Sequence, residues 1–131
     1  MIVLDTHVLV WWVSGTGRIS SQAARAIRVA LRAGPVAVST ISILEIATAV
    51  RRGRLALAVS VDQWLDDLRA LPEISFQPLS FEIARKAGAL GEAVPGDPAD
   101  RIIVATASVL GAKLVTADER LSKAAAIQTI W

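Results

Sequence analysis

Short apolar runs alternate with longer stretches of helical periodicity along the chain. Strands are expected where brief apolar runs are bounded by polar or turn-forming residues, at 2–4, 36–38, 74–77, 114–115 and 127–130. Helices are expected where apolar residues recur every three or four positions between capping and stop signals, at 7–13, 20–34, 42–52, 60–71, 80–90, 97–110 and 119–125. Strands and helices are therefore expected to alternate from one end of the chain to the other.

This alternation predicts an α/β fold. Parallel strands joined by helices form a sheet that is covered on both faces, and such sheets bind ligands beyond the carboxyl ends of their strands. The length of 131 residues is that of one ordinary domain, and no repeat, low-complexity tract or linker interrupts it. We therefore expect a single domain over residues 1–131, with functional residues at its strand-to-helix junctions.

The composition favours a packed domain and excludes several kinds of site. Apolar residues make up 53% of the chain, which suffices for a core and leaves apolar surface for self-association, so a homodimer is expected. No apolar run is long enough to span a bilayer and the start lacks the features of a signal peptide, so we expect a cytoplasmic protein that does not enter a membrane. With no cysteine and one histidine, any metal must bind through oxygen or that imidazole.

Positive charge is concentrated in the first half of the chain, although the net charge is only +2. Between Thr6 and Val61 there are seven arginines and a single acid, Glu45. Such a distribution is typical either of a surface that binds a polyanion or of solvated helix faces. The sequence leaves both interpretations open.

Four acids lie where functional residues are expected in an α/β fold. Asp5 follows the first strand and Asp118 follows the strand at 114–115, whereas Glu45 and Asp100 fall in the first turns of two expected helices. Brought together, they would form an oxygen-rich, negatively charged pocket of the kind that holds Mg²⁺ or Mn²⁺ through a few carboxylates and several waters.

Each acid also has a structural interpretation. Glu45 could close a capping box with Ser42, Asp100 is favourable to the dipole of its helix, and Asp118 could cap the helix that follows it. Asp5 differs from these three, because a carboxylate next to a buried strand is a poor packing choice and has no obvious cap to make. A functional role is therefore favoured for Asp5.

Four segments in this order resemble the PIN-domain family over essentially the whole chain: MIVLDTHVLVWW, STISILEIA, PADRIIVATA and LVTADERL. The opening D-T-H-x-L-x-W resembles VapC-type toxins in particular. The resemblance implies a three-layer α/β/α domain with a central, mostly parallel sheet of four to five strands. It also implies a metal-dependent endoribonuclease, with the acids of the family falling on Asp5, Glu45, Asp100 and Asp118.

The expected cofactor is Mg²⁺ or Mn²⁺. The resemblance implies hydrolysis by metal-activated water, and the residues agree with it: no Ser-His-Asp arrangement is available around the one histidine, and no glycine-rich phosphate loop is present. Asp5 is the expected central ligand, Asp100 and Asp118 hold ions directly or through water, and Glu45 binds metal or orients the attacking water. Three hydroxyl residues lie beside these segments: Thr6, Ser39 and Thr116. Each is expected either to orient a carboxylate or to serve in a turn or cap, and the turn role is favoured for Ser39.

The resemblance to VapC toxins also implies an RNA substrate and a VapB-type antitoxin in a toxin–antitoxin hetero-oligomer. Arg51, Arg52 and Arg54 end the helix that begins near Glu45, where they are favourable to the helix dipole and could also contact RNA phosphates. The alternative is an inactive PIN-fold module that binds RNA or acts as a scaffold. Such modules lack one or more of the acids, and none is missing here.

Several residues near these segments are expected to lie outside the catalytic set. Asp97 precedes Pro98 and is placed to cap a helix. His7 favours a structural or substrate-edge role, and it stands where a haloacid dehalogenase-type phosphatase needs a second aspartate, which excludes that class. Trp11 and Trp12 point about 100° apart on a helix, so either one of them is an interface residue or both are partly buried.

Overall fold

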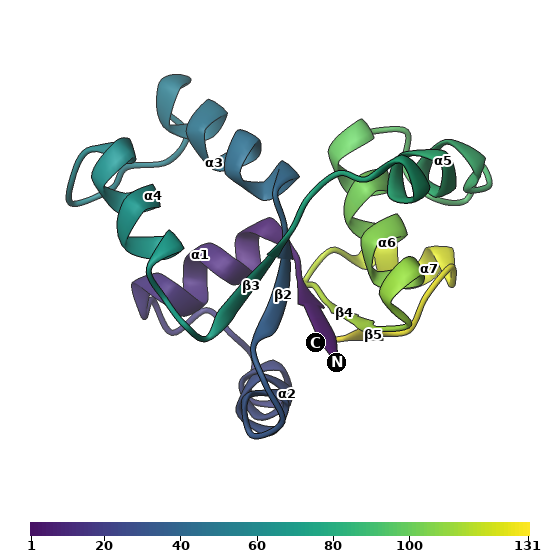
Figure 1. The fold of residues 1–131 in the computed structure, drawn as a ribbon, viewed down its shortest axis with the longest axis horizontal. Helices are drawn as coiled ribbons and strands as arrows, with labels where there is room; N and C mark the ends of the chain where they lie inside the picture. Colours follow the sequence, from purple (N-terminus) through teal and green to yellow (C-terminus); the bar gives the residue numbers. More distant parts are fainter.

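Five parallel strands form one sheet at the centre of the molecule (Figure 1). The computed structural model describes residues 1–131. The strands, in spatial order, are β3 (Ile74–Gln77), β2 (Val36–Ser39), β1 (Ile2–Leu4), β4 (Lys113–Val115) and β5 (Thr129–Ile130). The predicted α/β class and the predicted parallel sheet are confirmed.

Seven helices connect the strands, close to the expected positions. They are α1 (Thr6–Ser14), α2 (Ser21–Leu31), α3 (Ile41–Arg51), α4 (Val61–Arg69), α5 (Phe81–Ala89), α6 (Pro98–Leu110) and α7 (Glu119–Ala124). Gly15 and Gly111 end α1 and α6 in the left-handed conformation, which glycine adopts at low cost. None of these helices has the length and apolarity that crossing a bilayer requires.

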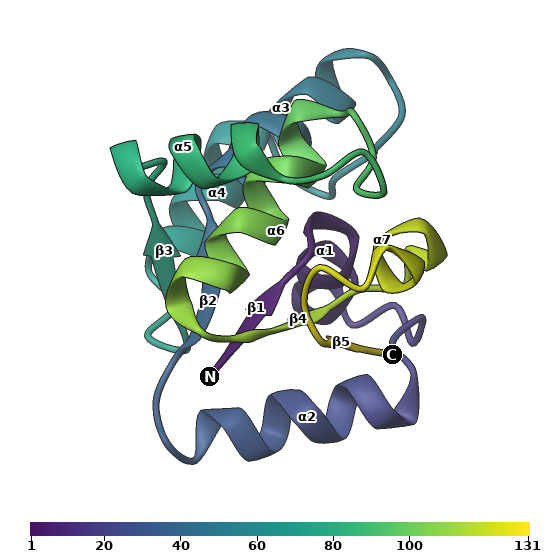
Figure 2. The ribbon, with the colours of Figure 1, turned by 90° about the vertical axis from the view of Figure 1, so that its right-hand side faces the viewer.

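The sheet is buried on both faces, because successive residues of β1 point to opposite sides. Leu4 belongs to a core that includes side chains of α1, α2, α3 and α4, whereas Val3 belongs to a second core with α6 and α7. Ile83 and Ala87 pack α5 onto the outer side of α6 (Figure 2). These layers confirm the three-layer α/β/α arrangement.

The register of the central strands brings their carboxyl ends to one edge. Leu4 of β1 pairs with Val38 of β2 on one side and with Val115 of β4 on the other. The residues that follow these three positions therefore emerge side by side. Asp5 and Thr116 are two of them, so the fold places residues from the two ends of the chain at a single site.

Candidate active site at the carboxyl edge of the sheet

Asp5 is fixed at the point where β1 turns into α1. Its Oδ1 accepts a hydrogen bond from the backbone N–H of Thr6 at 2.8 Å, and its Oδ2 accepts one from the hydroxyl of Thr116 at 2.6 Å. The residue is only 7% exposed and caps α1. The expectation that Asp5 has no cap to make was wrong, because the chain passes from strand to helix without an intervening loop. The carboxylate therefore has a structural bond and is also held in one orientation.

Thr116 joins the last part of the chain to the first. Besides donating to Asp5, its hydroxyl accepts a hydrogen bond from the backbone N–H of Asp118 at 3.0 Å. Thr116 is fully buried. It has the geometry expected of a residue that orients Asp5, and it couples that carboxylate to the start of α7.

A chain of hydroxyl groups connects α1 with α3. Thr6 Oγ1 donates to Glu45 Oε1 at 2.5 Å, so its contact with Ser42 Oγ at 2.8 Å is one in which Ser42 donates. The capping box expected for Ser42 and Glu45 was wrong. Helix α3 begins at Ile41 with Thr40 as its N-cap, so Glu45 lies in the second turn and its carboxylate points to α1. Ser42 is buried on that same face, and only the packing of the two helices reveals its role.

The acids at the starts of α6 and α7 differ in role. Asp97 caps α6, since its Oδ1 accepts a hydrogen bond from the backbone N–H of Ala99 at 2.9 Å, as the sequence predicted. Asp100 lies in the first turn of that helix with a side chain only 13% exposed. Asp118 caps α7 by accepting from the backbone N–H of Arg120 at 2.9 Å. The predicted cap at Asp118 is thus confirmed, while its second carboxylate oxygen stays outside the cap.

Arg120 bridges two of these acids, and the sequence pattern gave no indication of it. Its guanidinium lies 2.7 Å from Asp118 Oδ2 and 3.4 Å from Asp100 Oδ2. The Arg120 side chain is 65% exposed, so it can move away from the acids at low cost. It supplies positive charge at a site that is otherwise acidic.

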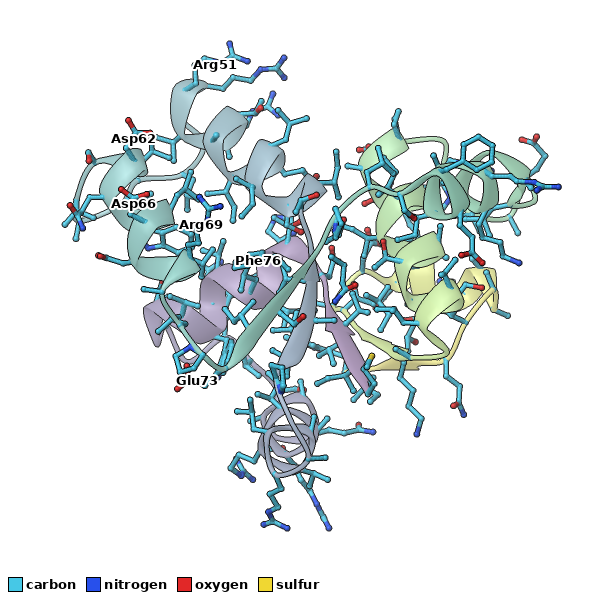
Figure 3. The ribbon with its side chains drawn as sticks, viewed as in Figure 1. Arg51, Asp62, Asp66, Arg69, Glu73 and Phe76 are labelled. Atoms are coloured by element: carbon cyan, nitrogen blue, oxygen red, sulfur yellow. The ribbon has the colours of Figure 1, made fainter.

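The remaining candidates lie farther from the acids. The Ser39 hydroxyl accepts a hydrogen bond from the backbone N–H of Ile41 at 3.2 Å, which is a turn contact. Arg52 and Arg54 line a groove that also contains Glu45. Arg51 stands at the outer end of α3 and points away from the sheet (Figure 3), so it is not brought to the site.

The acids at this edge perturb one another electrostatically. Burial, followed by the negative charges of Asp97 and Asp5, raises the pKa of Asp100 to about 6, against a weaker opposing effect of Arg120. Burial also raises the pKa of Glu45, and the charges of Asp5 and Asp97 add to this, whereas the hydrogen bond from Thr6 lowers it. Each of these carboxyls is therefore easier to protonate than a free one.

Asp118 shows the opposite effect. The hydrogen bond from Arg120 lowers the pKa of Asp118, and the positive charge of that guanidinium acts in the same direction. One cation is therefore enough to stabilise an ionised carboxylate here. Glu45 makes no ion pair, and Asp100 has only the longer contact with the same guanidinium.

The donor set fits a hard divalent cation that retains part of its water. No group of three acidic or histidine side chains is arranged to hold one metal ion by itself. Mg²⁺ is commonly bound through one or two carboxylates and several waters, and every candidate ligand here is a carboxylate oxygen. A cation would also offset the burial and the mutual repulsion that raise the pKa of Asp100 and of Glu45.

Comparison with known proteins supports one family. The model of the PIN domain family matches residues 2–127. Over 120 residues, covering 92% of this chain and 88% of the relative, the sequence is 39% identical to Ribonuclease VapC22 of Mycobacterium tuberculosis.

Solved structures share the fold at lower identity. VapBC2 of Rickettsia felis, bound to a DNA fragment from its promoter, has a TM-score of 0.72 at 17% identity and covers 98% of this chain and 97% of that chain. FitAcB of Neisseria gonorrhoeae has a TM-score of 0.68 at 21% identity and covers 98% of this chain and 96% of that chain.

Proposed function

Since the chain belongs to the PIN-domain family, with a VapC ribonuclease among its relatives, we propose that it is an endoribonuclease that hydrolyses RNA phosphodiester bonds with Mg²⁺ or Mn²⁺. We further propose that it is the toxin of a VapBC toxin–antitoxin pair. The observation that supports the activity is the acidic cluster at the carboxyl edge of the sheet. Asp5, Glu45 and Asp100 perturb one another electrostatically, Arg120 joins Asp100 to Asp118, and two hydrogen bonds fix Asp5.

A bound divalent ion supplies the charge that polarises the scissile phosphate and lowers the pKa of a water molecule. Asp5, Asp100 and Asp118 are the residues that would hold it, directly or through water. Asp5 keeps one orientation because each of its oxygens already accepts a hydrogen bond, and a carboxylate oxygen has further lone pairs for a cation.

The role proposed for Glu45 is to move a proton. Its Oε1 accepts the bond from Thr6, which leaves Oε2 free to take a proton from the attacking water. Burial raises its pKa, and a base with a raised pKa binds that proton more strongly. Ser42 holds the Thr6 hydroxyl in the donating direction, so the orientation of Glu45 depends on both α1 and α3.

Arg120 balances charge at the same site. Its contacts with Asp100 and Asp118 neutralise part of the acidic cluster. Asp100 and Asp118 would release the guanidinium if they held a cation in its place. The freed, flexible side chain is then positioned to bind the negatively charged phosphate of the substrate.

The proposed protein partner is a VapB-type antitoxin in a hetero-oligomer that contains a homodimer of this chain. The solved structure from Rickettsia felis is that of a VapBC pair. Apolar side chains that a partner could cover are present here, notably Phe81 at 84% and Leu79 at 48% exposure. Covering them would remove apolar surface from water.

The decisive test is cleavage of total RNA by the purified protein, with the ends of the products mapped. We expect cuts at defined sites with Mg²⁺ or Mn²⁺, no cuts in excess EDTA, and a loss of at least about a hundredfold in rate for Asp5→Asn. Asp97→Asn is the matched control, because the asparagine still caps α6 and the acid lies outside the proposed ligand set. Robust cleavage in EDTA, or by Asp5→Asn, would contradict the proposal.

A further inference from the structure

A groove of about 730 Å³ opens beside the acids, between α1 and α3. The two helices begin at neighbouring strand ends and diverge (Figure 1), so Thr6 and Glu45 lie at the narrow end. Trp11 lies toward the end of α1, and Arg52 directly follows α3. The groove thus leads from an acidic end to a basic one, and its volume is that of an ordinary ligand site.

The basic end has no internal counter-ions. Arg18, Arg52 and Arg54 line the groove and are exposed, and none of them makes an ion pair, because both ion pairs of the protein belong to Arg120. Three unpaired guanidinium groups around one groove are complementary to a polyanion. This favours a binding surface over the solvated helix faces that the sequence left open.

Trp11 provides a flat apolar surface in the same groove. Its ring is half-buried, with the ring of His7 centred 5.8 Å away and that of Trp131 also at 5.8 Å. The guanidinium of Arg18 lies over the Trp11 ring, 5.9 Å from its centre. Planar groups in contact are about 3.5 Å apart, so a base stacked between the Trp11 ring and the Arg18 guanidinium needs about 7 Å between them. Arg18 would therefore have to move outward by only about 1 Å.

We propose that this groove is the binding path for single-stranded RNA, in which Trp11 and Arg18 hold one unpaired base between them. Arg52 and Arg54 bind the phosphates beside it. An aromatic ring next to unpaired arginines is the combination that binds unstacked bases and their backbone. Duplex RNA is excluded because its bases are stacked on one another. The inference rests on the proposed function, since the groove leads the strand to the acids.

The test measures binding without cleavage. A fluorescein-labelled single strand of about 12 nucleotides is titrated with protein in EDTA, because one stacked base and a few phosphates require only a short strand. We expect Arg18→Ala and Trp11→Leu each to weaken binding about tenfold. Trp11→Phe, which keeps an aromatic face, should retain most of the affinity.

Arg28→Ala is the matched control for Arg18→Ala. Arg28 is an equally exposed arginine on α2, which lies on the opposite side of the molecule from α3 (Figure 2). It should change the affinity by less than about twofold. Removal of the exposed Arg18 side chain does not disturb the core, so the test remains valid if Trp11→Leu fails to fold.

An abasic scan of the same strand tests stacking itself. At one position, loss of the base should weaken binding to the wild-type protein about tenfold. The same loss should not weaken binding to Trp11→Leu any further, because the abasic site and the substitution remove the same contact. The proposal is overturned if no position behaves in this way. It is also overturned if the variants bind RNA normally and lose only their affinity for the purified VapB-type antitoxin. That result would assign the groove to a peptide.

The outcomes separate this proposal from the proposed function. If the protein cleaves RNA with metal but Arg18→Ala and Trp11→Leu bind it like the wild type, the groove is wrongly assigned and the nuclease stands. If the variants weaken binding and no metal produces cleavage, the groove stands and the nuclease does not.

Discussion

Asp97 and Asp100 lie three residues apart at the start of α6 and have opposite surroundings. Asp97 is exposed and accepts a hydrogen bond from a backbone N–H, whereas the side chain of Asp100 is largely buried and lies near other negative charges. We expect Asp97→Ala to lower the free energy of unfolding by about 1 kcal/mol and to leave most of the cleavage activity in place. Asp100→Asn should abolish activity without loss of stability, because it removes a repelled charge.

Thermal unfolding with and without Mn²⁺, alongside RNA cleavage at saturating metal, distinguishes the two acids. The wild type and Asp97→Asn should both be stabilised by Mn²⁺, and Asp100→Asn should not. The assignment of Asp100 as a metal ligand fails if Asp100→Asn is still stabilised by Mn²⁺ and still cleaves RNA. It also fails if Asp97→Asn is the variant that loses the stabilisation and the cleavage.

The raised pKa of Asp100 also predicts a pH dependence in the protein without metal. A carboxyl whose pKa rises from 3.8 to about 6 on folding stabilises the fold when protonated; this contribution is fully present below pH 3.8 and is lost progressively as the pH rises from there through about 6. Asp100→Asn imitates the protonated state at every pH. It should therefore unfold at a higher temperature than the wild type at pH about 7.5. The difference should begin to narrow as the pH falls below about 6 and should vanish only as the pH approaches the unfolded pKa of 3.8.

Calorimetry of the two proteins over this pH range, in EDTA, measures that difference. Asp62→Asn serves as the control, because Asp62 lies on α4 away from the acids. A difference between Asp100→Asn and the wild type that stays constant from neutral to acid pH would show that Asp100 does not titrate in this range.

At the scale of elements, the contact between α1 and α3 depends on two buried hydroxyls. Thr6→Val leaves the buried Ser42 hydroxyl without its acceptor and Glu45 without its donor, so we expect it to cost about 1–3 kcal/mol of unfolding free energy. Ser42→Ala leaves the bond from Thr6 to Glu45 in place and should cost about 1 kcal/mol. The double variant should lose less than the sum, because both changes break one network.

Urea denaturation of the three variants provides these free energies. Thr6→Ser, which keeps the hydroxyl, is the control and should preserve the bond to Glu45. If Thr6→Val and Ser42→Ala are additive, the two hydroxyls do not form the coupled chain described here.

The elements themselves could be predicted from the sequence, because periodicity, caps and glycine stops are local signals. Asp97 before Pro98 and Gly111 after the apolar face of α6 mark that helix within a residue. The surroundings of Glu45 could not be predicted in this way. Its local pattern is that of a capping box, and only the position of α1 against α3 shows that Thr6 is its partner.

The site could be located from the sequence but not completed. Asp5 and Asp118 follow apolar strands, which is a signal that a reader of the sequence can see. Thr116 bonds to a residue 111 positions away, and the register between β1 and β4 creates that contact. Arg120 reaches Asp100 through a long, flexible side chain, and no sequence spacing encodes where such a side chain points.

At the scale of the whole molecule, the distribution of arginines predicts how RNA binding responds to salt. The groove contains three arginines without ion pairs. If each contacts one phosphate of a single strand, the logarithm of the binding constant should fall with the logarithm of salt concentration with a slope of about −2. Fluorescence titrations from about 50 to 200 mM salt measure this slope, and an affinity that does not change would show that the groove makes no phosphate contacts.

The order of strands in the sheet bears on when the protein becomes dangerous to the cell that makes it. A ribosome releases β1 first, yet the neighbour that completes the bonding of β1 is β4, which begins at Lys113. Until that late segment has emerged and folded, Asp5 has no Thr116 to hold it, and neither Asp100 nor Asp118 is in place. If the proposed function holds, we therefore expect that a nascent chain cannot cut the message that it is being translated from. The capacity to cut RNA would then arise at the end of synthesis rather than grow with the length of the chain.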